Sequence, residues 1–286
     1  MRPCALLLAL ILAGCSAPAQ PLPAQPLPAQ PLPAQPLPAQ PLPAQPLPAQ
    51  PLPVQSAPAQ SAPAPSVGAA SVSAGTIVTL GDSVPAGTAC DCEPFPDLYA
   101  ALLSPPARSI NDARPGYTSA DVRGQLSDAS VRAALGSATV VLIMAGANDL
   151  ADAFDNGRDE DAYRAAAAGV RQNVDATVAA IHQDQPAAVT VLVLGYWNVV
   201  KDGAVGLATY GADGERSAVT ATRYADDALR RAAGDSGARY VATTALFDGA
   251  RRDQDPTDLL AADGDHPNAD GHRAIANAVF AALPTG

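Results

Sequence analysis

Residues 76–83 read Thr-Ile-Val-Thr-Leu-Gly-Asp-Ser, an apolar run that ends in glycine, aspartate and serine. The apolar run favours a buried strand, and the residues after it favour a turn. Ser83 therefore lies where a strand gives way to a turn, and its hydroxyl is open to solvent and substrate. A serine at such a position is a candidate nucleophile, and a nucleophilic serine requires a general base.

The candidate base lies near the C-terminus, in Asp263-Gly264-Asp265-His266. A carboxylate three residues before a histidine can accept a hydrogen bond from the imidazole Nδ1–H, which fixes the tautomer and leaves Nε2 free as a base. Asp265 competes with Asp263 for this role. Because Asp265 is adjacent to His266 in the chain, we expect its side chain to point away, and Asp263 is the predicted partner.

Acyl transfer also requires donors aimed at the developing oxyanion. One candidate is the backbone N–H of Gly116, in the stretch 111–119. The other is the side-chain amide of Asn148, in Gly-Ala-Asn-Asp directly after the strand-like residues 139–144.

Taken in order, these blocks resemble those of the SGNH, or GDSL-type, hydrolases: Ser83 in Gly-Asp-Ser, Gly116, Asn148 in Gly-x-Asn-Asp, and His266 in Asp-x-x-His-Pro-Asn. Each block is short, but all four in the correct order form a strong signature. The resemblance covers about residues 75–283.

The resemblance implies that Ser83 is the nucleophile and gives one oxyanion N–H. It implies that Gly116 and Asn148 give the other donors, and that His266 is the base, oriented by Asp263. The expected reaction is carboxylic ester hydrolysis through an acyl-enzyme, with no metal or organic cofactor. Thioesterase and carbohydrate O-deacetylase activities stay open, as does a noncatalytic module that binds surface glycan or envelope polymer in the same cleft.

Other serine and glycine motifs are disfavoured. Position 85 is proline, so Ser83 does not lie in the Gly-x-Ser-x-Gly elbow of α/β-hydrolases. The same stretch lacks the glycine spacing of a dinucleotide site and the lysine of a P-loop.

Apolar runs alternate with helical patterns along the chain. Strands are expected over residues 76–80, 108–111, 139–144, 188–194 and 238–242. Amphipathic helices are expected over 163–181, about 218–233, and after Pro267. The alternation predicts an α/β fold of parallel strands with right-handed crossovers, whose ligands bind at the carboxyl edge. The family resemblance implies a three-layer α/β/α, flavodoxin-like order with a five-stranded parallel sheet.

The remaining residues are weaker candidates for a functional role. Tyr196 and Trp197 follow the fourth strand and either line a substrate pocket or plug the sheet by packing against it. His272 is expected to pack or cap rather than to ligate. Asp82 and Asp149 are expected to hydrogen-bond a turn and a helix terminus.

The first 74 residues carry no catalytic motif. Residues 1–14 read as a signal peptide, and Leu-Ala-Gly-Cys at 12–15 resembles the bacterial lipobox, which implies cleavage before Cys15 and lipid attachment to its sulfur. The alternative is an ordinary signal with an incidental cysteine. Residues 15–74 form a linker that includes six copies of Pro-Leu-Pro-Ala-Gln over 21–50, a sequence that favours polyproline II. We interpret it as a spacer, although a proline-binding partner would also explain it.

Residues 75–286 then form the hydrolase domain, which we expect to be extracytoplasmic, anchored to the membrane by lipid in the cell envelope, and monomeric. The formal net charge of −11, with Lys201 as the one lysine, argues against nucleic acid or anionic lipid as a partner.

Cys90 and Cys92 either form a Cys-x-Cys disulfide, which the export signal permits, or remain free thiols. A zinc site is not expected, because two cysteines are too few ligands and no histidine is near them in sequence.

Overall fold

The computed structural model describes residues 75–184 and 189–283. The predicted signal peptide, the predicted lipidation site at Cys15 and the proline-rich linker lie outside these residues, as does the first residue of the predicted strand 188–194. In the described part of the chain, no helix combines the length and apolar character needed to cross a membrane.

Five parallel strands form one sheet in the order β2-β1-β3-β4-β5. They are β1 (Thr76–Gly81), β2 (Arg108–Asn111), β3 (Val140–Met144), β4 (Thr190–Leu194) and β5 (Arg239–Val241). Each lies within one or two residues of a predicted strand. The order is that of a flavodoxin-like sheet, so the predicted fold class is confirmed.

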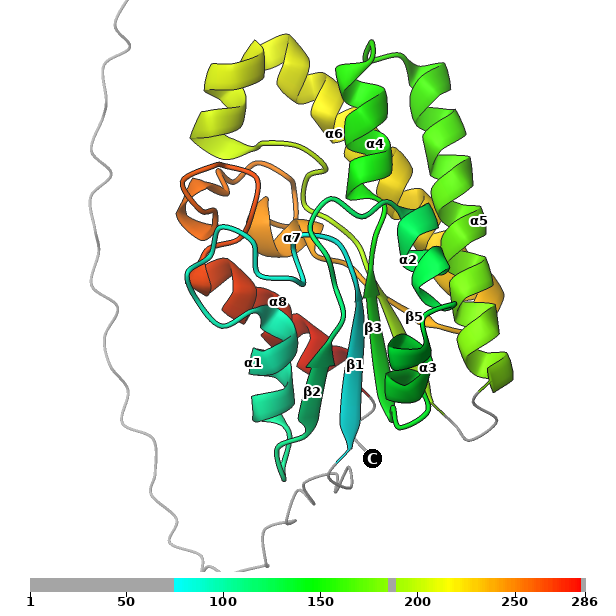
Figure 1. Cartoon of the computed structure of the whole chain (residues 1–286). Helices are drawn as coiled ribbons and strands as arrows, with labels where there is room; N and C mark the ends of the chain where they lie inside the picture. Colours follow the sequence, from blue (N-terminus) through cyan, green and yellow to red (C-terminus); the bar gives the residue numbers. More distant parts are fainter. Residues whose placement is uncertain (1–74, 185–188, 284–286) are drawn as a thin grey trace, which may run out of the picture. The chain divides into compact units, whose positions relative to one another are not determined.

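Helices cover both faces of the sheet (Figure 1). One face carries α1 (Phe95–Leu102) and α8 (Ala269–Ala282), and the other carries α2 (Ser119–Gln125), α3 (Ala129–Leu135), α5 (Glu160–Asp184) and α6 (Gly203–Ser236). The remaining elements, α4 (Ala147–Asp155), α7 (Thr244–Phe247) and the 3-10 turn Thr257–Leu259, lie toward the carboxyl ends of the strands. This edge is therefore built from loops and short helices, as a ligand site in a parallel sheet requires.

The core lies between the sheet and these two helical layers. All five residues of β3 are buried, as expected for a central strand covered on both faces. On α5, the residues that recur every three or four positions are buried as predicted: Tyr163, Ala167, Val170, Val174, Val178 and Ile181. The predicted apolar face of α8 is also buried at Ile275 and Val279.

Helix α6 is longer than the predicted segment 218–233. Its first part begins at Gly203, where the carboxylate of Asp202 accepts a hydrogen bond from the Gly203 N–H, and the helical path breaks at Gly211, with φ 66° and ψ 173°. The glycines of this first part disfavour a helix in isolation, so periodicity identified only the second part.

Candidate active site

Ser83 follows β1 directly, at the carboxyl edge. Its position depends on Gly81, because a Cβ at Gly81 would collide with the carbonyl oxygen of Met144 on the neighbouring strand. The Asp82 N–H donates to the same oxygen at 3.1 Å. Glycine is needed here because it permits this close approach between β1 and β3.

Asp82, next to the nucleophile, is buried and serves two donors. Its Oδ1 accepts from the Val84 N–H at 3.1 Å, which is the predicted turn bond, and its Oδ2 accepts from the Tyr196 hydroxyl. Burial raises the pKa of Asp82 to about 7, although both hydrogen bonds act to lower it. Asp82 therefore fixes the turn after Ser83 and ties it to the end of β4.

His266 and Asp263 are joined as the spacing predicted. Asp263 Oδ2 lies 2.7 Å from His266 Nδ1, and Asp263 Oδ1 accepts the backbone N–H groups of Asp265 and His266 at 3.0 and 3.1 Å. Burial acts to raise the pKa of Asp263, but these hydrogen bonds outweigh it and hold the pKa below its usual value. An ionised Asp263 fixes the ring so that Nε2 is available as a base.

Asp265 takes a different place. Its side chain lines a cavity that also contains Ser83 and His266, and burial raises its pKa. The structure thus puts Asp263, and not Asp265, on the imidazole Nδ1, in agreement with the choice made from spacing.

A cavity of about 240 Å³ contains most of the predicted site. Ser83, Asn148, Tyr196 and His266 are among its lining residues. These side chains come together from four segments: those that follow β1, β3 and β4, and the loop before α8.

The two predicted oxyanion donors come from adjacent segments. Asn148 is the second residue of α4, after Gly146 with φ 127°, and its Nδ2 donates to the carbonyl of Tyr117 at 2.8 Å. Gly116 has φ 80° and does not itself line the cavity. Within the described residues, neither Gly116 N–H nor Ser83 N–H makes a hydrogen bond, and the Asn148 amide keeps a second hydrogen.

Asp149 links the same two segments by hydrogen bonds. Its carboxylate accepts from the Ser119 N–H at 2.8 Å and from the Ser119 hydroxyl at 2.7 Å. This is the helix-terminal role expected for Asp149, at the N-terminus of α2. The bonds fix α2 to α4 and so position the loop that carries Gly116.

The two candidate pocket aromatics, Tyr196 and Trp197, differ in whether they line the cavity. Tyr196 lines the cavity, but its hydroxyl is engaged with Asp82. Trp197 stacks on Phe247 with ring centroids 4.0 Å apart and is buried. Substrate contact was therefore the wrong interpretation for Trp197, because its ring packs under α7 instead of facing the cavity.

Sequence reasoning missed part of the cavity wall. Residues 198–201, directly after Trp197, line it, as do Asp155 of α4 and Tyr210 of α6. Because Lys201 is the one lysine of the chain, the sequence alone could have marked it as a candidate. The other residues carry no recognisable pattern, because a loop brings 198–200 to the cavity and the packing of α4 and α6 brings Asp155 and Tyr210.

Comparison with known proteins identifies the family of this chain. Residues 79–274 match the model of the GDSL-like Lipase/Acylhydrolase family. The chain belongs to this family. The hydrolase is thus an enzyme that acts on carboxylic esters, and the matched segment contains all four blocks from Ser83 to His266.

Solved structures share the fold of this GDSL-like hydrolase. A lipase from a goat rumen metagenome, Lip_vut3, is 19% identical with a TM-score of 0.58, and the match covers 73% of this chain and 97% of that one. Phospholipase A1 from Streptomyces albidoflavus NA297 is 23% identical with a TM-score of 0.54, over 74% and 100% of the two chains. An acetylxylan esterase from Geobacillus stearothermophilus is 18% identical with a TM-score of 0.53, over 74% and 96%. No curated protein matches the sequence.

Proposed function

We propose that this hydrolase is an extracytoplasmic, lipid-anchored serine esterase that works through an acyl-enzyme intermediate. The observation that carries the mechanism is the bond of 2.7 Å between Asp263 and the Nδ1 of His266, at a cavity that Ser83 also lines. The location rests on the lipobox that ends at Cys15 and on the linker that follows it.

In the proposed reaction, His266 Nε2 takes the proton of the Ser83 hydroxyl as its oxygen attacks the ester carbonyl. The oxyanion accepts from the backbone N–H groups of Ser83 and Gly116 and from the Asn148 amide. His266 then protonates the leaving alcohol. Water, deprotonated by His266, attacks the acyl-enzyme and releases the acid and the free serine.

The cavity favours a short acyl group. Its volume of about 240 Å³ is below the range of about 300–1,000 Å³ that is usual for ligand pockets. The structural neighbours include lipases, a phospholipase and an acetylxylan esterase, so they leave both long and short acyl groups open. We propose acetyl to butyryl esters as the substrates, which keeps carbohydrate O-deacetylation as a second candidate.

Labelling by a fluorophosphonate, with Ser83→Ala as the test variant, decides whether the serine mechanism operates. We expect wild type to be labelled and Ser83→Ala to lose both labelling and hydrolysis of nitrophenyl acetate while it stays folded. Ser127→Ala, which changes an exposed serine on the α2–α3 turn, is the matched control and should behave as wild type. A folded Ser83→Ala variant that retains most of its activity would contradict the mechanism.

A series of nitrophenyl esters tests the acyl preference separately. We expect kcat/KM to be highest for acetate to butyrate and to fall for octanoate and longer chains. A maximum at long chains would assign the enzyme to lipid substrates. If wild type is neither labelled nor active on any ester or thioester, the cleft belongs to a noncatalytic binding module.

A further inference from the structure

His272, on α8, makes a hydrogen bond that determines which of its ring nitrogens carries the proton. The side chain is fully buried, and its Nδ1 accepts the N–H of Phe95 at 3.2 Å. Phe95 is the first residue of α1, whose N-cap residue, Pro94, provides no side-chain cap, so His272 caps α1 across the structure. Because Nδ1 is an acceptor, the proton of the neutral ring is on Nε2. Burial, helped by His266, lowers the pKa of His272 to about 4 and keeps the ring neutral.

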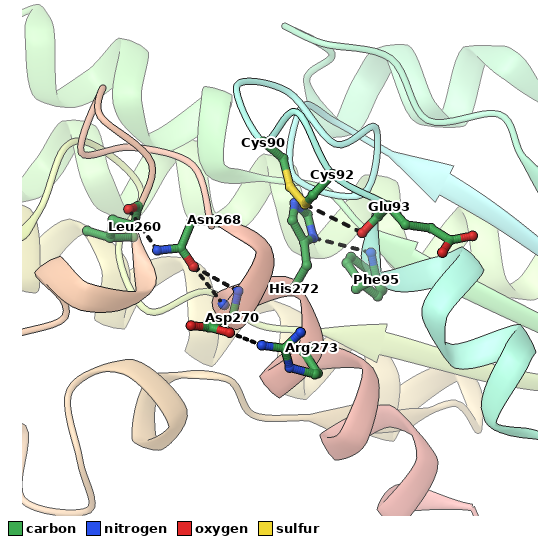
Figure 2. Close-up of a disulfide and its surroundings, with 10 residues drawn as sticks. Cys90, Cys92, Glu93, Phe95, Leu260, Asn268, Asp270, His272 and Arg273 are labelled. Carbon is green, nitrogen blue, oxygen red and sulfur yellow. Dashed lines mark hydrogen bonds and ion pairs between the residues drawn. A yellow bond between two sulfur atoms is a disulfide. The ribbon is translucent and has the colours of Figure 1, made fainter.

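The Nε2–H of His272 has no hydrogen-bond partner among the described residues. A buried donor without an acceptor is uncommon and costs stability. A ring nitrogen of His272 and the sulfurs of Cys90 and Cys92 lie within 4.8 Å of one another, and Figure 2 shows the imidazole directed toward the disulfide between them. The free donor therefore points at the cysteine pair.

The pair itself is accessible. Cys90 and Cys92 are bonded, with Cα atoms 5.0 Å apart, and both residues are only partly buried. The disulfide was one of the two states expected from the sequence. The histidine beside it was not expected, because His272 lies far away in the chain and reaches the pair only through the packing of α8 against α1.

A metal ion fits this group poorly. Coordination through Nε2 would require a lone pair there and would move the proton to Nδ1, where it would face the N–H of Phe95. Histidines that bind metals usually donate their second N–H to an acceptor, and structural zinc takes four ligands. Within the described residues the group supplies three.

A thiolate, by contrast, is the acceptor that the Nε2–H lacks. In the structure, where the two cysteines are bonded, Cys92 Sγ lies 3.6 Å from the carbonyl oxygen of Glu93, so this oxygen is placed to accept the S–H that Cys92 gains on reduction. Cys90 is then the sulfur left to accept from His272. The flanking carboxylates of Asp91 and Glu93 are exposed, so water screens their repulsion, and Figure 2 shows the Glu93 carboxylate turned away from the sulfurs.

We propose that Cys90, Cys92 and His272 form a thiol–disulfide exchange site, which is separate from the ester-hydrolysing cavity and takes low-molecular-weight thiols or disulfides. None of its three residues lines that cavity.

For a disulfide R–S–S–R, the Cys90 thiolate attacks one sulfur and forms a mixed disulfide, and RS⁻ leaves. The departing RS⁻ takes the Cys92 proton, and the Cys92 sulfur then attacks the Cys90 sulfur. The second RS⁻ leaves and takes a proton from water, so the pair has lost two electrons to R–S–S–R. Two molecules of R–SH run the sequence in reverse.

The test uses the full-length protein with reduced and oxidised glutathione as the probe. Peptide mass spectrometry after alkylation measures the redox state of a peptide that contains Cys90 and Cys92 but neither Cys4 nor Cys15. Cys4 and Cys15 therefore do not contribute to this signal. We expect the folded protein to pass between disulfide and dithiol as the glutathione ratio changes. In the dithiol form, the pH at which iodoacetamide alkylation of Cys90 is half-maximal should lie at least about one unit below the ordinary thiol value of about 8.5.

Two substitutions at His272 are matched to its two nitrogens. His272→Asn keeps an acceptor near Nδ1 for the Phe95 N–H but removes the Nε2 donor, so the alkylation midpoint should return to about 8.5. His272→Gln keeps a donor near Nε2, so the midpoint should stay low. Ser83→Ala should lose ester hydrolysis and keep normal exchange, which separates this site from the proposed esterase.

A second measurement requires no variant. The Nε2–H resonance of His272 in the wild type should move downfield when the disulfide is reduced, because it then donates to a thiolate. An unmoved resonance, equal midpoints in wild type and His272→Asn, or a disulfide that glutathione cannot reduce in the folded protein would overturn the proposal. Binding of one zinc ion by the reduced wild type, lost in His272→Asn, would overturn it in favour of a metal site.

Discussion

At the scale of single residues, two aspartates compete for the histidine, and their contacts differ. Asp263 bonds His266 Nδ1, whereas Asp265 faces the cavity. Asp263→Asn should lower kcat by about 10³–10⁴, because the amide can present its N–H to Nδ1 and stabilise the wrong tautomer. Asp265→Asn, the matched control, should cost far less. Steady-state kinetics on nitrophenyl acetate measures both, and the reverse order of damage would assign the orienting role to Asp265.

The buried bond between Tyr196 and Asp82 leads to a prediction about pH. Burial raises the pKa of Asp82 from its ordinary value of 3.8 to about 7, so the folded state holds a proton that the unfolded state has lost. The free energy of unfolding therefore falls as the pH rises from 3.8 toward 7. Tyr196→Phe removes a donor that favours the ionised carboxylate, which raises this pKa further and extends the fall to higher pH.

Urea denaturation measures this effect between about pH 6 and pH 8. Tyr196→Phe should lose about 1–3 kcal/mol, and the loss should grow with pH, since an ionised Asp82 is left short of a donor. Tyr163→Phe is the control: this tyrosine is equally buried, but its hydroxyl bonds the neutral Ser217 at 2.8 Å, so its smaller loss should not change with pH. A loss that is independent of pH in both variants would show that Asp82 does not titrate in this range.

At the scale of elements, the N-terminus of α4 and the loop before α2 act together. The bond from Asn148 to the Tyr117 carbonyl holds the Gly116 loop beside the cavity. Asn148→Ala should remove both this bond and one oxyanion donor. We expect it to lower kcat by about 10²–10³, with a smaller change in KM. Asn173→Ala, which removes the bond of 3.1 Å from α5 to Ser119, loosens the same loop region without touching the cavity and should keep most of the activity. A change in KM alone for Asn148→Ala would assign Asn148 to ground-state binding.

The elements also show why some of the fold could be predicted and some could not. Buried strands and the apolar face of α5 have a periodicity set by their own geometry, so the sequence alone identified them. Asp263 and His266 are three residues apart, so local geometry alone sets their contact. Trp197 and His272 depend on long-range packing, against Phe247 and Phe95 respectively, and no local pattern encodes it. The first part of α6 was missed for a related reason: contacts with Asp202 and Thr257 hold a glycine-containing segment in helical form.

For the chain as a whole, net charge and the proposed lipid on Cys15 have opposite effects on membrane binding. The sequence carries a net charge of −11, with no charged residue between Arg2 and Asp82. An acidic domain is repelled by anionic lipid headgroups, so electrostatics would not hold this hydrolase at a membrane. A lipid on Cys15 would do so, and an uncharged proline-rich spacer would keep the domain at a distance from the surface.

Two alterations of the N-terminal region test this arrangement. Cys15→Ser should prevent lipid attachment and move the protein from the detergent-extracted membrane fraction to the soluble fraction. Equal partitioning of wild type and Cys15→Ser would refute the anchor. Ser16→Ala, next to the lipobox, is a control that should leave partitioning unchanged.

Deletion of residues 21–50 removes the six repeats but no residue of the cavity. Hydrolysis of nitrophenyl acetate should be unchanged, because every residue of the proposed mechanism lies between Ser83 and His266. Hydrolysis of a polymeric ester in intact cell envelopes should fall, because the shortened chain no longer extends from its anchor by up to about 3.1 Å for each deleted residue. Loss of activity on the small ester would show instead that the repeats belong to the folded enzyme, and equal activity on the envelope would show that reach is not their purpose.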